Sequence, residues 1–169
     1  MRRDLRHSRA MDELILTPSI ADAMTSHAHW LMVAVCLVLV ALTVGLHYEA
    51  LERFNDWLPR LRLPKRARIL FLMVGLLLVH TAEIWIFGVA LFEVARWPQL
   101  GRVLGVDELR LLDAVYLSTA TYTTVGYGDL TPQGPLRLLL GMESLSGFLL
   151  VTWSASFTYL EMQRNWRVS

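Results

Sequence analysis

Three long apolar stretches set the pattern of the chain: Trp30 to Leu46, Ile69 to Val94, and Leu136 to about Leu160. Each is long enough, or nearly so, to cross a hydrocarbon core of about 30 Å, which takes about 20 helical residues. Polar and basic residues collect between and beyond them. The pattern therefore predicts an all-α membrane protein, with transmembrane helices over residues 29–52, 69–94 and 135–161.

A shorter helical pattern lies between the second and third stretches, over residues 108–122. It follows Asp107, a residue type that caps helix N-termini well. At about 15 residues, such a helix can only half span a membrane. Its C-terminal carbonyl groups would direct partial negative charge at whatever lies beyond them. We expect a re-entrant helix that enters from one face of the membrane and ends inside it.

This half-length helix ends at the run Thr-Thr-Val-Gly-Tyr-Gly-Asp, residues 123–129. Non-helical backbone is tolerated at membrane depth only where protein surrounds it or where it lines a pore. Gly126 and Gly128 permit backbone angles that residues with a Cβ avoid, so consecutive carbonyl groups can face one axis. A ring of such carbonyls can replace the hydration shell of K⁺. The run predicts a selectivity filter in which Val125 and Tyr127 turn outward as packing.

The same run matches the signature of the tetrameric potassium channel family, and the order pore helix, filter, inner helix resembles that family over about residues 68–162. Small bacterial ion-channel proteins with a two-helix pore and one extra N-terminal helix are the most similar in layout. The resemblance implies that K⁺ is the permeant ion. The residues that would coordinate K⁺ are Thr124, Val125, Gly126, Tyr127 and Gly128. Thr124 would contribute both its hydroxyl and its carbonyl oxygen.

The resemblance also implies a set of residues that support the filter. In the family, the aspartate at the end of the filter run is held by hydrogen bonds from the pore helix. The matching residue in this chain is Asp129. Tyr116 lies where an aromatic donor is often found, and Thr123 precedes the coordinating residues. Some relatives carry a glutamate where this chain has Ala120, so one carboxyl brace is absent. A solvated charge at the pore mouth is the alternative role for Asp129.

The third long helix carries the expected gate. Pro135 suits its first turn, where a missing N–H is harmless. By resemblance, Gly147 is the candidate hinge, because Gly141 is too early after the filter; close helix packing is the alternative role for Gly147. With Gly147 as register, helical spacing places Tyr159 toward the cytoplasmic end. The side chains predicted to line a mostly apolar cavity are Phe148, Val151, Thr152 and Ala155.

Ionisable residues inside the spans are the unusual feature of this sequence. A charge near the bilayer centre costs about 2.5 to 3.5 kcal/mol on insertion scales, so each must face protein or water, or be neutral. His80 and Glu83 lie at i and i+3 on one helix face. We expect Glu143 to meet them behind the pore helix, while His47 and Glu49 end the first span. A structural hydrogen-bonded cluster and a proton-sensitive gate both fit this pattern.

Two other functions are compatible with these residues. An intramembrane metal-dependent enzyme would use His80, Glu83, Glu143 and His47 as ligands, since histidine and glutamate at this spacing occur in carboxylate-bridged metal sites. The expected topology places His47 and Glu143 toward opposite membrane faces, and no nucleophile converges with them. We therefore expect no enzyme, no transition metal and no cofactor. A non-conducting accessory subunit is the other alternative, although every residue of the filter run is intact.

Composition agrees with a single membrane domain. Of the 169 residues, 54% are hydrophobic and 18% are charged, and the mean hydropathy is +0.42. The net charge is only +1, and the basic residues lie beside the apolar stretches, so the sequence argues against a nucleic-acid partner. Cys36 is the single cysteine, which excludes an intrachain disulfide. Because it lies in an apolar run, we expect a buried small hydrophobic residue.

The predicted loop 53–68 is basic, and the positive-inside rule makes it cytoplasmic. The N-terminal arm, 1–28, is then external, the tail, 163–169, is cytoplasmic, and the filter opens outward. Arginines near the start of the chain oppose this orientation, and a start at Met24 would remove the conflict. The first span contains no Arg or Lys, so it is not a voltage sensor.

One pore loop per chain and a filter built from fourfold carbonyl rings imply a closed assembly of identical subunits. We therefore expect a homotetramer, in which each chain has three further copies of itself and the lipid bilayer as partners. The expected location is the bacterial inner membrane.

Overall fold

The computed structural model describes residues 26–166, with side chains up to Arg164. Nearly all of the predicted N-terminal arm and the end of the predicted tail lie outside the described residues. The elements in chain order are α3 (His27–Trp57), η1 (Leu58–Arg60), α4 (Lys65–Ala95), η2 (Pro98–Leu100), β1 (Arg102–Leu104), α5 (Leu111–Tyr122), β2 (Thr131–Gln133) and α6 (Leu136–Trp166). Within the described residues, α3, α4 and α6 are long and apolar enough to cross a membrane.

Each long helix extends beyond its predicted span. Helix α3 continues five residues past position 52, α4 starts four residues before position 69, and α6 continues past position 161. Only residues 58–64 connect α3 to α4, so the loop predicted over 53–68 is largely helical. A helix can continue beyond the hydrocarbon core of the membrane, where charged residues are tolerated. The change from apolar to charged residues therefore indicates the boundary of the hydrocarbon core and not the end of the helix. Pro59 and Pro64 mark the actual ends.

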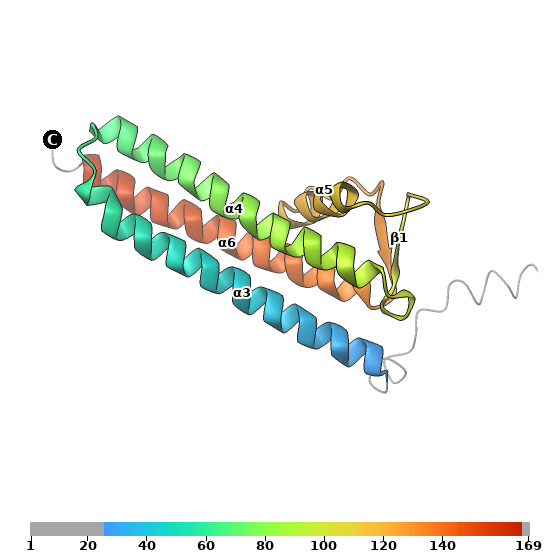
Figure 1. Cartoon of the computed structure of the whole chain (residues 1–169). Coiled ribbons are helices and arrows are strands. Elements are labelled where there is room, and N and C mark those ends of the chain that lie inside the picture. The colour runs from blue at the N-terminus through green and yellow to red at the C-terminus, as the bar shows by residue number, and fades with distance from the viewer. Residues whose placement is uncertain (1–25, 167–169) are drawn as a thin grey trace, which may run out of the picture.

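The three long helices lie side by side, and α5 packs on α4 and α6 near one end of the bundle (Figure 1). The start of α3, the end of α4 and the start of α6 are at that same end, while the α3–α4 connection and the end of α6 are at the other. Helix α3 packs against both α4 and α6. Cys36 is buried in this packing next to Met32 and Leu39, which confirms its predicted place in the core.

The start of α5 differs from the prediction. The helix begins at Leu111, three residues after position 108, and the carboxylate of Asp113 accepts a hydrogen bond from the Arg110 backbone N–H at 3.0 Å. The prediction that Asp107 caps this helix is therefore wrong. Residues 102–104 form β1 instead, and this strand pairs antiparallel with β2, with Val103 opposite Pro132. Residues 105–110, between β1 and α5, are not helical, so the helix is shorter at its start than predicted.

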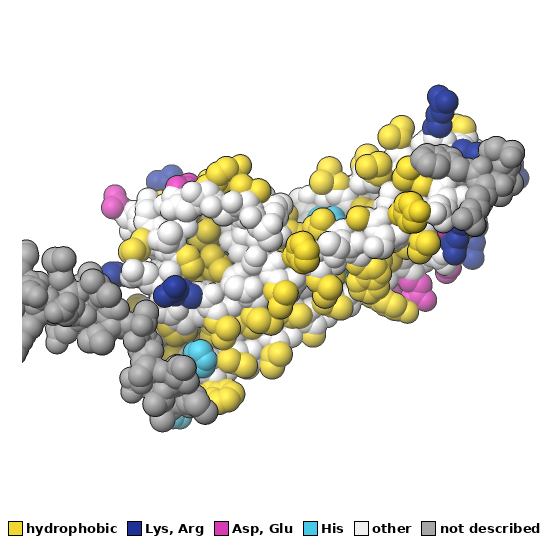
Figure 2. Space-filling model, turned by 180° about the vertical axis from the view of Figure 1, so that it is seen from behind, with side chains coloured by type: hydrophobic (Ala, Val, Ile, Leu, Met, Phe, Trp, Pro, Cys, Tyr) yellow, Lys and Arg dark blue, Asp and Glu magenta, His cyan; other side chains and the backbone are white. Residues whose placement is uncertain are grey.

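The outer surface of the bundle is apolar along its length. Figure 2 shows hydrophobic side chains over the middle of the molecule and charged side chains toward its two ends. Leu37 and Val38 on α3, and Leu77 and Leu78 on α4, are each more than 60% exposed. Exposed residues of this size and number are unfavourable in water but match a hydrocarbon environment. The fold is thus an all-α membrane protein, as predicted.

Candidate functional site

The backbone of the predicted filter alternates in hand. Helix α5 ends at Tyr122, and Thr123 is still right-handed. Positive φ angles then occur at Thr124 (59°), Gly126 (54°) and Gly128 (80°). The two glycines take the left-handed conformation that the sequence predicts for them, whereas Thr124 does so without that prediction. A β-branched residue at positive φ is strained and persists only where its surroundings hold it, which is common at functional sites.

The end of α5 holds the first residues of the filter. The N–H of Thr124 donates to the Thr121 carbonyl at 2.9 Å, and the N–H of Gly126 donates to the Ala120 carbonyl at 3.0 Å. The hydroxyl of Thr123 donates to the carbonyl of Thr119 at 2.7 Å. These bonds tie the non-helical run to the last turn of the helix. Thr123 therefore contacts α5 directly, while its role in supporting a filter stays a prediction.

The C-terminal end of the predicted filter is attached to α5 through two tyrosines. The Tyr116 hydroxyl donates to Asp129 Oδ2 at 3.0 Å, and the Tyr116 ring stacks on the Tyr127 ring with centroids 6.2 Å apart. A Cβ on Gly105 would strike the Asp129 carbonyl oxygen, so only glycine fits there. The pairing of Tyr116 with Asp129 matches the prediction from family resemblance.

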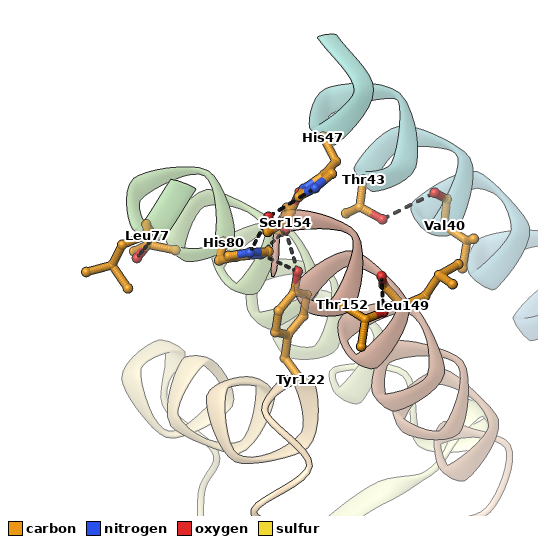
Figure 3. A network of polar contacts seen from close by, with 11 residues as sticks. Val40, Thr43, His47, Leu77, His80, Tyr122, Leu149, Thr152 and Ser154 are labelled. Atoms are coloured by element: carbon orange, nitrogen blue, oxygen red, sulfur yellow. Dashed lines mark hydrogen bonds and ion pairs between the residues drawn. The ribbon is translucent and has the colours of Figure 1, made fainter. Parts of the chain in front are cut away.

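A second set of polar residues lies at the inner end of α5. Tyr122 is the last residue of α5, and near its hydroxyl lie His47 from α3, His80 from α4 and Ser154 from α6 (Figure 3). Glu83 of α4 accepts a hydrogen bond from this hydroxyl. We call these five residues the histidine–glutamate cluster. His47, Glu83 and Tyr122 are almost completely buried, and the side chain of His80 is 15% exposed. The cluster joins all four helices at one point.

Glu83 is the centre of this cluster. Its Oε1 lies 2.9 Å from His47 Nδ1, and its Oε2 lies 2.9 Å from His80 Nδ1. The Tyr122 hydroxyl donates to the same Oε2. Ser154 Oγ lies 3.0 Å from His80 Nε2 and 3.3 Å from His47 Nε2. When both imidazoles carry their proton on Nδ1, three donors converge on this carboxyl group, an arrangement that stabilises an ionised carboxylate in a buried place.

Glu143 is not part of this cluster, which corrects the prediction that it meets His80 and Glu83. It lies eleven residues before Ser154 on α6, a rise of about 16 Å along a helix. Glu143 Oε1 instead contacts the Ser118 hydroxyl, which also lies 2.8 Å from the Ile84 carbonyl. Ser118 has one proton for these two acceptors, so a protonated Glu143 that donates to Ser118 Oγ would leave the Ser118 proton for the Ile84 carbonyl.

The other oxygen of Glu143 supports this protonation state. Glu143 is completely buried, and its Oε2 has no hydrogen-bond partner among the described residues. An unpaired oxygen of a neutral carboxyl group is much less costly to bury than an unpaired carboxylate oxygen. The two buried glutamates thus differ: Glu83 is surrounded by donors, and Glu143 is a neutral group against the back of α5.

The inner helix packs closely on the end of α5. A Cβ on Gly147 would strike the Tyr122 carbonyl oxygen and lie 2.9 Å from its carbonyl carbon. Close packing therefore explains this glycine, while its role as a hinge stays a prediction. The side chains predicted to line the cavity share one exposed face of α6 in the single chain, as does Tyr159: Phe148, Val151, Thr152 and Ala155.

Among the described residues, His47, His80 and Glu83 could hold a metal ion, because one ligand atom of each lies within 4.8 Å of the others. In this structure the nitrogen and oxygen atoms concerned are already hydrogen-bonded to one another. The predicted topology separated His47 from the membrane interior, whereas α3 carries it to the inner end of α5. The four-residue ligand set weighed from the sequence does not assemble, since Glu143 bonds Ser118 instead.

A family model described as "Ion channel" matches residues 72–163. This stretch runs from α4 through the filter into the last turns of α6 and covers more than half of the chain. The chain belongs to this ion channel family. The match begins after α3, so the first long helix lies outside the part of the chain that the ion channel family defines.

A comparison with curated proteins agrees with an ion channel. The two pore potassium channel a of Oryza sativa subsp. japonica is 31% identical over 96 residues, which cover 57% of this chain and 23% of that protein. The chain thus spans less than a quarter of the length of this relative. No solved structure matches the chain.

Proposed function

We propose that this chain is the subunit of a potassium-selective channel that conducts K⁺ passively across a membrane. The alternating positive φ angles at Thr124, Gly126 and Gly128 carry this proposal, because they lie in the ion channel segment directly after a half-length helix. Such alternation turns successive carbonyls toward one axis, where they can replace the hydration shell of K⁺. The relative from Oryza sativa subsp. japonica is a potassium channel, which supports the same ion.

Four copies of the chain would form the pore. One chain supplies one filter strand, and a closed ring of carbonyls needs several around a symmetry axis. Large hydrophobic residues near the proposed axis are exposed in the single chain: Val125 is 55% exposed, Tyr127 70% and Phe148 61%. Residues of this kind are expected to pack against neighbouring copies. A homotetramer follows from the proposed filter, with lipid around its outside.

The proposed orientation places the filter end outside the cell and the α3–α4 connection inside. That connection and the adjoining helix ends carry the basic residues, which favour the cytoplasmic side. The start of α3 and the filter share the opposite end of the bundle (Figure 1). The orientation expected from the loop charges and the orientation expected from the filter are therefore the same. The bacterial inner membrane is the proposed location.

Flux measurements in liposomes test this function. The purified chain is reconstituted, and K⁺ and Na⁺ fluxes are compared with and without Ba²⁺. Gly126→Asp is the control, since it places a side chain and a charge at a positive-φ position of the filter. We expect a K⁺-selective, Ba²⁺-blocked flux that the control lacks. Equal K⁺ and Na⁺ fluxes, or a flux unchanged in the control, would contradict the proposal.

A further inference from the structure

The first long helix, α3, lies outside the ion channel segment but is not a peripheral addition. We propose that α3 supports the selectivity filter, with His47 as a positioning residue that acts through Glu83 on Tyr122. This inference rests on the proposed potassium-channel function and gives the extra helix a part in it. It makes the filter of this channel dependent on a residue outside the pore segment.

The line of contacts from α3 to the filter is short. His47 Nδ1 lies 2.9 Å from Glu83 Oε1, and the Tyr122 hydroxyl donates to Glu83 Oε2. Tyr122 is the last residue of α5 and directly precedes Thr123, whose hydroxyl and backbone start the filter support. All three members of the line are almost completely buried. One carboxylate therefore separates His47 of α3 from Tyr122, the residue directly before the proposed filter.

Charge explains why His47 matters to Tyr122. Among the described residues, His47 is the hydrogen-bond partner of Glu83 Oε1, while His80 and Tyr122 both contact Oε2. Without His47, a buried carboxylate oxygen would lose its donor, which is costly in an apolar interior. Glu83 would then rotate toward its remaining donors or take up a proton. Either change alters one of the two contacts of the Tyr122 hydroxyl, the other being His80 Nδ1 at 2.9 Å.

The backbone of Tyr122 cannot move independently of its ring. Its carbonyl oxygen is packed against Gly147 of α6 so closely that no Cβ fits between them. Ser154 of α6 also links the far nitrogens of His47 and His80, at 3.3 Å and 3.0 Å. The end of α5 is thus held between α6 on one side and the Glu83 carboxylate on another. A brace at this place would support the proposed filter from the end of α5.

The test measures selective K⁺ binding, which does not require an open gate. A ligand that binds the folded state protects it against unfolding in proportion to its affinity. Thermal unfolding of the purified full-length chain in detergent is therefore followed over a series of K⁺ and Na⁺ concentrations. We expect protection of the wild type at much lower K⁺ than Na⁺. In His47→Leu, the K⁺ concentration for half-maximal protection should rise roughly fivefold, equivalent to about 1 kcal/mol.

Two matched variants separate bracing from general destabilisation. His47→Asn places an amide N–H near the position of Nδ1, keeps a donor for Glu83 and cannot titrate, so it should bind K⁺ like the wild type. Thr43→Val removes a buried hydroxyl one turn earlier on α3, where it bonds only its own helix at Leu39 and Val40. Its K⁺ dependence should also be unchanged. An equal defect in His47→Asn and His47→Leu would overturn the proposed donor role.

A double variant tests the line of contacts itself. Tyr122→Phe should weaken K⁺ protection like His47→Leu, and the two together should be no worse than either alone, because both break one connection. The inference would be overturned if the rise in the K⁺ concentration for half-maximal protection in the double variant were the product of the two single rises. K⁺ protection in His47→Leu equal to that of the wild type would also overturn it. If the wild type shows neither K⁺ protection nor K⁺ flux, the proposed function itself fails. The wild type thus tests the function, and the variants test the brace.

Discussion

Replacing Gly147 by alanine tests the packing between the inner helix and the end of α5. A Cβ at this position would strike the Tyr122 carbonyl oxygen and lie 2.9 Å from both the carbonyl carbon and Cγ of Tyr122. Two of these atoms belong to the backbone, so no side chain can swing away to make room. Either α6 moves from α5, or the last turn of α5 shifts together with the filter that follows it.

The magnitude follows from two opposing terms. In a helix interior, alanine is favoured over glycine by about 1 kcal/mol. Forcing a methyl group into a packed contact costs about 1 to 3 kcal/mol, and a backbone obstacle favours the upper half of that range. We therefore expect Gly147→Ala to lower the free energy of unfolding by about 1 to 2 kcal/mol. The assay is reversible unfolding in mixed detergent micelles, followed by helical circular dichroism.

Gly141→Ala is the matched control on the same helix. A Cβ at Gly141 has no atom of the described chain within 4 Å, so only the helix-propensity gain applies. This variant should be as stable as the wild type or more stable. If Gly147→Ala were as stable as Gly141→Ala while its channel activity fell, close packing would not explain Gly147. The hinge role predicted from family resemblance would then be the better account.

Three further predictions concern the buried glutamates, a second glycine and the pore mouth. Glu143→Gln should change the free energy of unfolding by less than about 1 kcal/mol, because the carboxyl group that it replaces is neutral. Glu83→Gln should lower the free energy of unfolding by about 3 kcal/mol or more, because the hydrogen-bond donors around Glu83 lose a buried anionic acceptor. Equal costs would refute the assigned protonation states. Gly88→Ala should cost about 1 to 2 kcal/mol, since its Cβ would lie 2.9 Å from atoms of α5, and an unchanged unfolding midpoint would contradict this packing. Tyr116→Phe should leave unfolding within about 0.5 kcal/mol of wild type, yet raise the K⁺ concentration needed for protection by freeing Asp129; unaltered K⁺ protection would show that this bond does not support the filter.

The membrane made much of this fold predictable. A fixed hydrocarbon thickness demands apolar helices of nearly fixed length, so all three spans could be located from composition. The positive φ angles at Gly126 and Gly128 follow from the geometry of a carbonyl-lined strand, and the Tyr116–Asp129 bond matches the expectation from family resemblance. These features depend on residues close together in the sequence. Local rules were sufficient for them.

The contacts between helices could not be predicted in the same way. His47 and Glu83 are 36 residues apart. They meet because of the position of α3 along the axis of α4, which no local periodicity of the sequence specifies. Glu143 was expected with them because the second and third long helices were expected to pack together behind the pore helix, but its side chain contacts Ser118 instead. Tyr122 and Ser154 carry ordinary polar groups, and only the packing shows that they complete the cluster.

The reversal potential of the reconstituted channel tests the central claim most directly. A planar bilayer containing the purified chain separates equal concentrations of K⁺ and Na⁺, and the voltage of zero current gives the permeability ratio. The account predicts a large reversal potential, of the sign that only K⁺ movement produces, that disappears with the current in Gly126→Asp. A current that reverses near zero, with K⁺ and Na⁺ equally permeant, would contradict a potassium filter at residues 123–129.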